Sequence, residues 1–343
     1  MNFVIRWLSR FVLVLTVGAG LFACGGGGGE DATTPAVPSA TRTLAVVPAL
    51  GGFSAGATVS LISPAGAIIG SATTDASGAA NPVIGAYTGP FIIRVSGGTG
   101  VTFFNEKTGA QDAFGATARL LAVVPGLPAS APVPQVGVTP LTNAAAAVVV
   151  PNPDSPTISG SNTQAIIQTI ATANARIQIA VGLDPSSNIL AAPRVLRSAT
   201  DTLSSSDQNA LRYGALLTAL ALASTSNDLL GAANALAADA RVNNGALQQS
   251  AAVLTAAANQ LGSVIQRFVP AAQQAALTSF VASVKPDPTL SSPGAQAAIA
   301  AATAGYIASS SGSSSSAASS ASSVSSSASS SSVSSVSSSA SSA

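Results

Sequence analysis

The chain has 343 residues, of which 47% are hydrophobic and only 7% are charged, against about 25% charged in an average soluble domain. Its 13 basic and 12 acidic side chains give a formal charge of +1, which argues against a nucleic-acid partner because phosphate binding needs a clustered excess of Lys and Arg. It has no histidine and one cysteine, which removes the commonest general base and excludes disulfides within the chain. We therefore expect no catalytic residues, no metal site and no cofactor.

The first 23 residues have the pattern of a signal peptide. Arg6 and Arg10 precede an apolar run from Phe11 to Ala23, and a small residue stands directly before Cys24. A helix of 13 residues spans about 20 Å, which is short of a bilayer core of about 30 Å. A cleaved leader is therefore favoured over a permanent transmembrane anchor.

The end of this leader, Leu21-Phe22-Ala23-Cys24, resembles the lipobox of bacterial lipoproteins. The resemblance implies cleavage between Ala23 and Cys24, diacylglycerol on the Cys24 sulfur, and a further acyl chain such as palmitate on the new amino group. Several acyl chains on one residue give durable anchoring to a membrane. Gly25 in place of Asp after the cysteine resembles the outer-membrane sorting pattern of Gram-negative lipoproteins, which implies a lipid anchor on the periplasmic or the surface-exposed face of that membrane.

Residues 24–40 are rich in Gly and Pro without periodicity, which is typical of a disordered tether. Residues 41–127 then alternate short β-branched or aliphatic runs with Gly, Pro, Asn and Asp, which predicts a small antiparallel β-sandwich. The expected strands are Thr43–Val47, Thr58–Ile62, Ile68–Thr74, Phe91–Ser96, Val101–Asn105 and Thr117–Val124. Residues 74–78 have the composition of a hairpin turn, and Asp75 is interpreted as a turn residue because one carboxylate is too few for Ca²⁺.

Three segments of this region carry a further resemblance. They are GATVSL at residues 56–61, TTDASG at residues 73–78 and GPFIIRVSG at residues 89–97. Together they resemble the carboxypeptidase-regulatory-like, or transthyretin-like, sandwich that is common in bacterial surface proteins. The resemblance implies a seven-stranded β-sandwich over residues 41–127 with a non-catalytic spacing or binding role.

Residues 128–160 are interpreted as a Pro-rich linker that contains a short helix. The sequence VTPLT at residues 138–142 precedes an apolar run, Ala144–Val150, and Thr142 is the expected cap of the helix. VTPLT followed by Ala-rich helices is similar to a family of uncharacterised surface lipoproteins in Gram-negative bacteria. That similarity implies no activity.

Residues 161–308 change to a helical period. The apolar stripes that indicate helices are Ile166–Val181, Leu211–Leu220, Leu229–Ala240, Leu247–Phe268, Ala276–Val284 and Pro293–Tyr306. Short connections predict antiparallel neighbours in a helical bundle that is separable from the sandwich. Residues 309–343 contain only Ser, Ala, Gly and Val, which predicts a disordered tail. The expected fold class is therefore α+β and multidomain: an antiparallel β-sandwich, then an Ala-rich helical bundle.

The acidic residues beyond the tether mostly lie beside Pro, Gly, Ser or Asn, which predicts turns and helix starts instead of catalytic carboxylates. They are Asp75, Glu106, Asp112, Asp154, Asp184, Asp201, Asp207, Asp228, Asp239 and Asp287. Asp207 and Asp228 are the expected first-turn or capping residues of helices. Lys107 and Lys285 are expected in solvent, which leaves no buried lysine for a Ser–Lys dyad.

Taken together, these features predict a lipid-anchored envelope protein with a structural, adhesive or scaffolding role and no catalysis. Its expected partners are the membrane, through Cys24, and an envelope protein or a glycan. The alternative is a surface module that binds a glycan or a small apolar ligand, although no ligand-binding residue can be named. An exposed cluster of Tyr87, Phe91, Phe103 and Phe104 would favour this alternative, and burial of those rings would favour the structural role.

Overall fold

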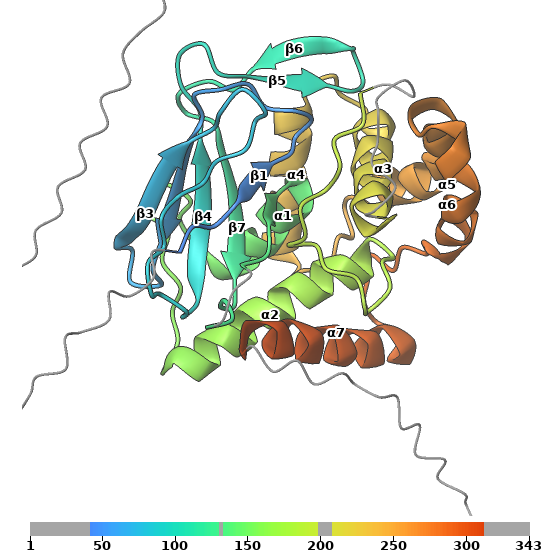
Figure 1. Ribbon diagram of the computed structural model, residues 1–343. Helices are drawn as coiled ribbons and strands as arrows, with labels where there is room; N and C mark the ends of the chain where they lie inside the picture. The colour runs from blue at the N-terminus through green and yellow to red at the C-terminus, as the bar shows by residue number, and fades with distance from the viewer. Residues whose placement is uncertain (1–41, 130–132, 198–207, 312–343) are drawn as a thin grey trace, which may run out of the picture. The chain divides into compact units, whose positions relative to one another are not determined.

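The computed structural model describes residues 42–129, 133–197 and 208–311, which combine β-strands and α-helices in one compact unit (Figure 1). The predicted signal peptide, Cys24, the tether and residues 312–343 of the predicted tail lie outside the described residues. Within the described ranges, no helix is both long and apolar enough to cross a membrane.

The largest sheet has four antiparallel strands in the order β3-β2-β4-β7. These strands are β2 (Thr58–Ile62), β3 (Ile68–Thr73), β4 (Phe91–Ser96) and β7 (Arg119–Val124). The predicted bounds of β2 and β4 are confirmed. Each strand is an apolar β-branched run that Gly or Pro delimits, so its ends are visible in the sequence. The fold is thus mixed α and β, with an antiparallel sheet as predicted.

Alternate residues of this sheet face two different cores. Ile93 pairs in register with Leu61 and Ala122, and all three belong to the main core. Ile92 and Val123 point to the opposite face, where helices α1 (Pro140–Val149) and α2 (Thr163–Ala180) cover a smaller core. At β4 and β7 both faces are mostly buried, which explains why these two strands are largely apolar runs in which polar residues stand near the ends.

The remaining strands form two small sheets. β5 (Thr102–Asn105) and β6 (Ala110–Ala113) make a hairpin, whereas β1 (Val46–Pro48) and β8 (Val136–Val138) pair in parallel. The sequence did not predict β6, whose residues AQDA have low β propensity. It also missed β8, which is too short to show a period and lies within the predicted linker.

Helix α1 (Pro140–Val149) lies at the centre of the fold and packs against α2, α4, β7 and β8. Its run of alanines and valines is apolar all round, which suits a helix buried on most sides. Its cap is Thr139 and not the predicted Thr142, because Pro140 occupies the first helical position. Thr142 completes a capping box: its amide donates to Thr139 Oγ1 (3.2 Å), and its hydroxyl accepts from the Thr139 amide (2.8 Å).

Polar side chains from α1 and α2 protect the outer edge of β7. Asn143 Oδ1 accepts from the Leu121 amide (3.0 Å), and Thr142 Oγ1 donates to the Leu121 carbonyl (3.2 Å). Asn174 Nδ2 donates to the Val123 carbonyl (3.0 Å). These bonds satisfy backbone groups that an edge strand would leave unpaired. The predicted linker is therefore a structural part of the sheet.

Within the residues that the structure describes, six more helices follow, and each corresponds to a predicted apolar stripe. They are α2 (Thr163–Ala180), α3 (Gln208–Ala223), α4 (Leu229–Val242), α5 (Ala251–Phe268), α6 (Ala271–Ser283) and α7 (Pro293–Ser311). Helix α7 runs beyond the predicted start of the tail, since the hydroxyls of Ser309 and Ser310 donate to carbonyls of the preceding turn. Residues 309–311 are therefore helical and do not belong to a tail.

Most helices pack against partners that are distant in sequence. The most extensive helix contacts join α1 with α4, α3 with α5, and α2 with α7 (Figure 1). Two further pairs, α1–α2 and α5–α6, are consecutive in the chain. This differs from the expected row of antiparallel neighbours, because α1 occupies the position between α2 and α4.

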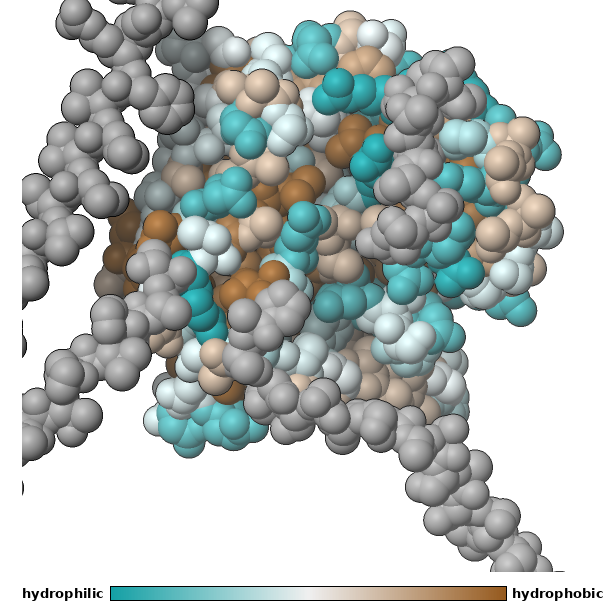
Figure 2. Space-filling model, in the orientation of Figure 1, coloured by the Kyte–Doolittle hydropathy of each residue, from teal (hydrophilic) through white to brown (hydrophobic). Residues whose placement is uncertain are grey.

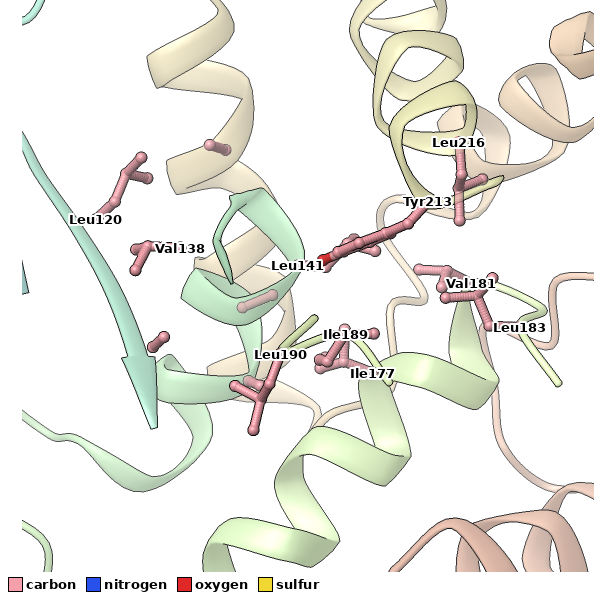
Figure 3. Packing of buried hydrophobic residues seen from close by; sticks show 14 of the residues in the cluster. Leu120, Val138, Leu141, Ile177, Val181, Leu183, Ile189, Leu190, Tyr213 and Leu216 are labelled. Carbon is pink, nitrogen blue, oxygen red and sulfur yellow. The ribbon is translucent and has the colours of Figure 1, made fainter. Parts of the chain in front are cut away.

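One main core runs from the strands into the helices. Its residues include Val59 and Phe91 of the sheet together with Ile177 and Leu261 of the helices. Figure 3 shows Tyr213 reaching from α3 toward α1, where its hydroxyl lies 2.7 Å from Thr139 Oγ1. The structure therefore shows no division of the core between a sandwich and a bundle.

Candidate ligand cavity

The four aromatic rings that the sequence singled out do not form an exposed patch. Phe91 and Phe103 are buried, and Tyr87 and Phe104 are half-buried. Phe103 stacks in the core, Tyr87 donates its hydroxyl to Pro90 O (2.7 Å), and Phe104 lies under a guanidinium. On the side drawn in Figure 2, hydrophobic residues are interrupted by hydrophilic ones. The rings therefore offer no stacking platform for a glycan.

The most promising site is a cavity of about 400 Å³ that is partly open to solvent. Helices α3 and α4 supply two of its walls, with Leu217 and Ala232 among their lining residues. The turn at 49–51, the segment 193–196 and the start of α5 supply the others. Small-molecule sites in proteins have volumes of about 300–1,000 Å³ and mostly apolar walls, so this cavity has the size and character of one.

Two glycines let the walls come together. Gly51 has a φ of +92°, and a Cβ there would lie 1.6 Å from Phe104 O. A Cβ on Gly214 of α3 would lie 1.9 Å from Arg194 O. Any larger residue at either position would push a wall segment away, so these close backbone approaches define the width of the cavity.

Glu106 reaches the cavity from the turn of the β5–β6 hairpin, and its two neighbours fix it there. Asn105 is fully buried, and its Nδ2 donates to Asn227 O (2.8 Å) and to Asp112 Oδ2 (2.6 Å). Lys107 Nζ donates to the carbonyls of Ser224 and Ser226 at the end of α3. These bonds tie the hairpin to the α3–α4 connection, so Glu106 is held between two anchored residues.

Glu106 is the only buried ionisable side chain among the described residues that line the cavity. Burial raises its pKa from an ordinary value of 4.5 to about 7, and the Arg197 guanidinium opposes only part of this rise. Arg194, the other ionisable lining residue, is exposed. Near neutral pH this carboxyl group is therefore present in both its protonated and its ionised form.

The other acids mostly serve as the turn and helix-start residues that the sequence predicted. Asp228 caps α4 by accepting from the Gly231 amide, and Asp75 accepts from the Ser77 amide and hydroxyl, which lowers its pKa. Asp184 and Asp287 accept from nearby backbone and hydroxyl groups in the same way. Asp201 and Asp207 lie outside the described residues.

Four residues differ from the sequence interpretation. Asp239 is buried inside α4, where it accepts from the Ser250 amide (2.8 Å), and Asp112 lies inside β6, so neither is a turn or helix-start residue. Glu106 belongs to a cavity wall, although its Asn-Glu-Lys-Thr-Gly surroundings are typical of an exposed turn. Lys107 is half-buried and binds the C-terminal carbonyls of α3, where a cation meets the negative end of the helix dipole. Lys285 is exposed, as predicted. Among the residues that the structure describes, no group of three His, Cys, Asp or Glu is placed to hold a metal ion.

Comparison with known proteins adds no family to this description. No family model matches the chain, and no curated protein or solved structure is significantly similar to it. The resemblances to a lipobox and to a transthyretin-like sandwich therefore remain predictions.

Proposed function

We propose that this chain is a lipid-anchored envelope protein whose folded unit binds a small apolar ligand in the cavity between α3 and α4. The observation that carries the proposal is the cavity itself, which is about 400 Å³ in volume and has mostly apolar walls. Cores are close-packed, and voids larger than a water molecule are few in a domain. An apolar space of this size therefore supports a binding function over a purely structural one.

Filling the cavity tests this function. Ala232 is half-buried on the α4 wall, so Ala232→Phe places a ring in the space that the ligand would use. Ala238 is exposed on the same helix and does not line the cavity, which makes Ala238→Phe the matched control. We expect the neutral fluorophore N-phenyl-1-naphthylamine to bind the unmodified protein and Ala238→Phe equally, and to bind Ala232→Phe at least tenfold more weakly. Equal binding by all three proteins would contradict the proposal.

The lipid anchor rests on the leader and on Leu21-Phe22-Ala23-Cys24. In cells, Cys24→Ser should remain an uncleaved precursor and incorporate no labelled palmitate, because a serine hydroxyl is a far weaker nucleophile than a thiolate. Ala23→Gly keeps a small residue before the cysteine and should be labelled normally. Labelling of Cys24→Ser at the level of the unmodified protein would refute the anchor. Protease treatment of intact and broken cells then distinguishes the surface from the periplasmic face of the outer membrane.

A structural or adhesive role toward another envelope component is the second candidate. It is supported by the burial of Phe91 and Phe103, which leaves the aromatic cluster without an exposed binding face. In this role the cavity would be incidental, and the Ala232→Phe variant would keep its full activity in cells. Comparing cells that carry Ala232→Phe with cells that carry Ala238→Phe therefore discriminates the two candidates, because only a function in the cavity makes the two variants differ.

A further inference from the structure

We propose that the ligand of this cavity is an amphiphile with an apolar body and a primary ammonium group, and that Glu106 binds the ammonium. The inference rests on the proposed function, since it names the class of ligand that the same cavity would take. Apolar walls select for the body of such a ligand, and one buried carboxylate selects for its head group.

The position of Glu106 is the first argument. Its Oε2 lies 3.1 Å from the point where a Cβ on Gly51 would stand, and both residues line the cavity. Glu106 is the only acid among the described lining residues, and the other charged lining residue, Arg194, is exposed to solvent.

The positions of the neighbouring cations are the second argument. Lys107 Nζ is bound to two backbone carbonyls. Arg197 packs against Gly52 and lies 5.9 Å from the centre of the Phe104 ring, and it does not line the cavity. It lowers the pKa of Glu106 less than burial raises it. A buried carboxylate gains most from a donor that makes a short charged hydrogen bond, and an ammonium on the ligand supplies one.

The charge of the site also argues against an anionic amphiphile. A fatty-acid carboxylate in the cavity would place a second negative charge beside Glu106. The fatty acid could bind only after one of the two carboxylates took up a proton. A neutral alcohol can donate a hydrogen bond to Glu106 but gains no ion pair. Octylamine, 1-octanol and octanoate therefore separate the three possibilities, because they share one apolar chain.

Calorimetric titration of the full chain with these three probes tests the inference. At pH 8.5 we expect octylamine to bind at least tenfold more tightly than octanol, and octanoate to bind more weakly than octanol. At pH 5.5 protonation of Glu106 should reduce the advantage of the amine about tenfold, while the affinity for octanol stays constant. In Glu106→Gln the amine and octanol should bind with similar affinities at both pH values, whereas Asp75→Asn, which changes an exposed acid outside the cavity, should keep the preference for the amine.

A second measurement needs no variant. Near pH 7, amine binding to a half-ionised Glu106 should release about half a proton, which titrations in buffers of different ionisation enthalpy detect. Octanol binding without an amine preference, or an amine preference that survives Glu106→Gln, would overturn the inference and leave the cavity as a ligand site. Tighter binding of octanoate at pH 8.5 would also overturn it. If none of the probes binds, the proposed function itself fails.

Discussion

Glu106→Gln should have a higher free energy of unfolding than the unmodified chain at pH 8, and this advantage should be much smaller at pH 4. The pKa of Glu106 is about 7 in the folded protein and about 4.5 in the unfolded chain. Between these values the folded state holds more protons, so its stability falls as the pH rises from 4.5 to 7 and is constant above that range. The two pKa values correspond to a loss of about 3 kcal/mol, which a neutral glutamine avoids.

Urea unfolding at pH 4 and pH 8 measures this effect as the difference in the free energy of unfolding between Glu106→Gln and the unmodified chain. Asp75→Asn is the matched control, because Asp75 is an exposed acid whose pKa is lowered in the folded state. The Asp75 carboxylate stabilises the folded protein above its unfolded pKa, and this effect is lost as the pH falls. Asp75→Asn should therefore lower the stability slightly at pH 8, which is the opposite of the effect expected for Glu106→Gln. An equal pH dependence in Glu106→Gln and the unmodified chain would show that Glu106 is not buried in the folded protein.

The elements that sequence reasoning predicted best are those with a strong period. Strands β2 and β4 are β-branched runs with Gly or Pro beside them, and the stripes of α3 and α4 are bounded by Ser, Asp and Gly. Their local pattern agrees with their tertiary environment, so pattern alone was sufficient. The same local reasoning predicted one helix cap correctly, because Asp228 was identified as a helix-start residue and is the N-cap of α4.

Residues 128–160 show why the rest could not be predicted. A Pro-rich composition is typical of a linker, and a strand of three residues has no measurable period. Yet Val136–Val138 pairs with β1, and Pro140–Val149 forms the buried helix α1. What makes this segment structural is its contact with elements that precede and follow it, and local sequence does not contain that information.

The cavity could not be predicted for a related reason. Its lining residues come from six separate segments (49–51, 106, 140, 193–196, 214–236 and 249–253), and most of them are small or aliphatic residues that are common throughout the sequence. Glu106 has the neighbours of an exposed turn, and only the packing of the hairpin against the α3–α4 connection buries it. No local signal therefore separates Glu106 from the acids that lie in turns.

A fragment of residues 161–311 expressed alone should fail to melt cooperatively, although its helical period suggests an independent bundle. The fragment lacks α1, which is the main partner of α4 and also packs against α2. It also lacks Val136, whose strand bridges to Ala191. Truncating a single buried leucine such as Leu141 to alanine costs about 2–5 kcal/mol, and domains are stable by only about 5–15 kcal/mol. Removing the whole helix therefore exceeds the stability that the fragment has available.

Residues 39–311 are the positive control, because they include the strands, α1 and all the later helices, and they should melt cooperatively in circular dichroism at 222 nm. Mixing residues 39–160 with residues 161–311 should restore a cooperative transition, since the two pieces together rebuild the shared core and the edge of β7. Cooperative melting of residues 161–311 by themselves, unchanged when the other piece is added, would show that the helices form their own core and that α1 is dispensable to them.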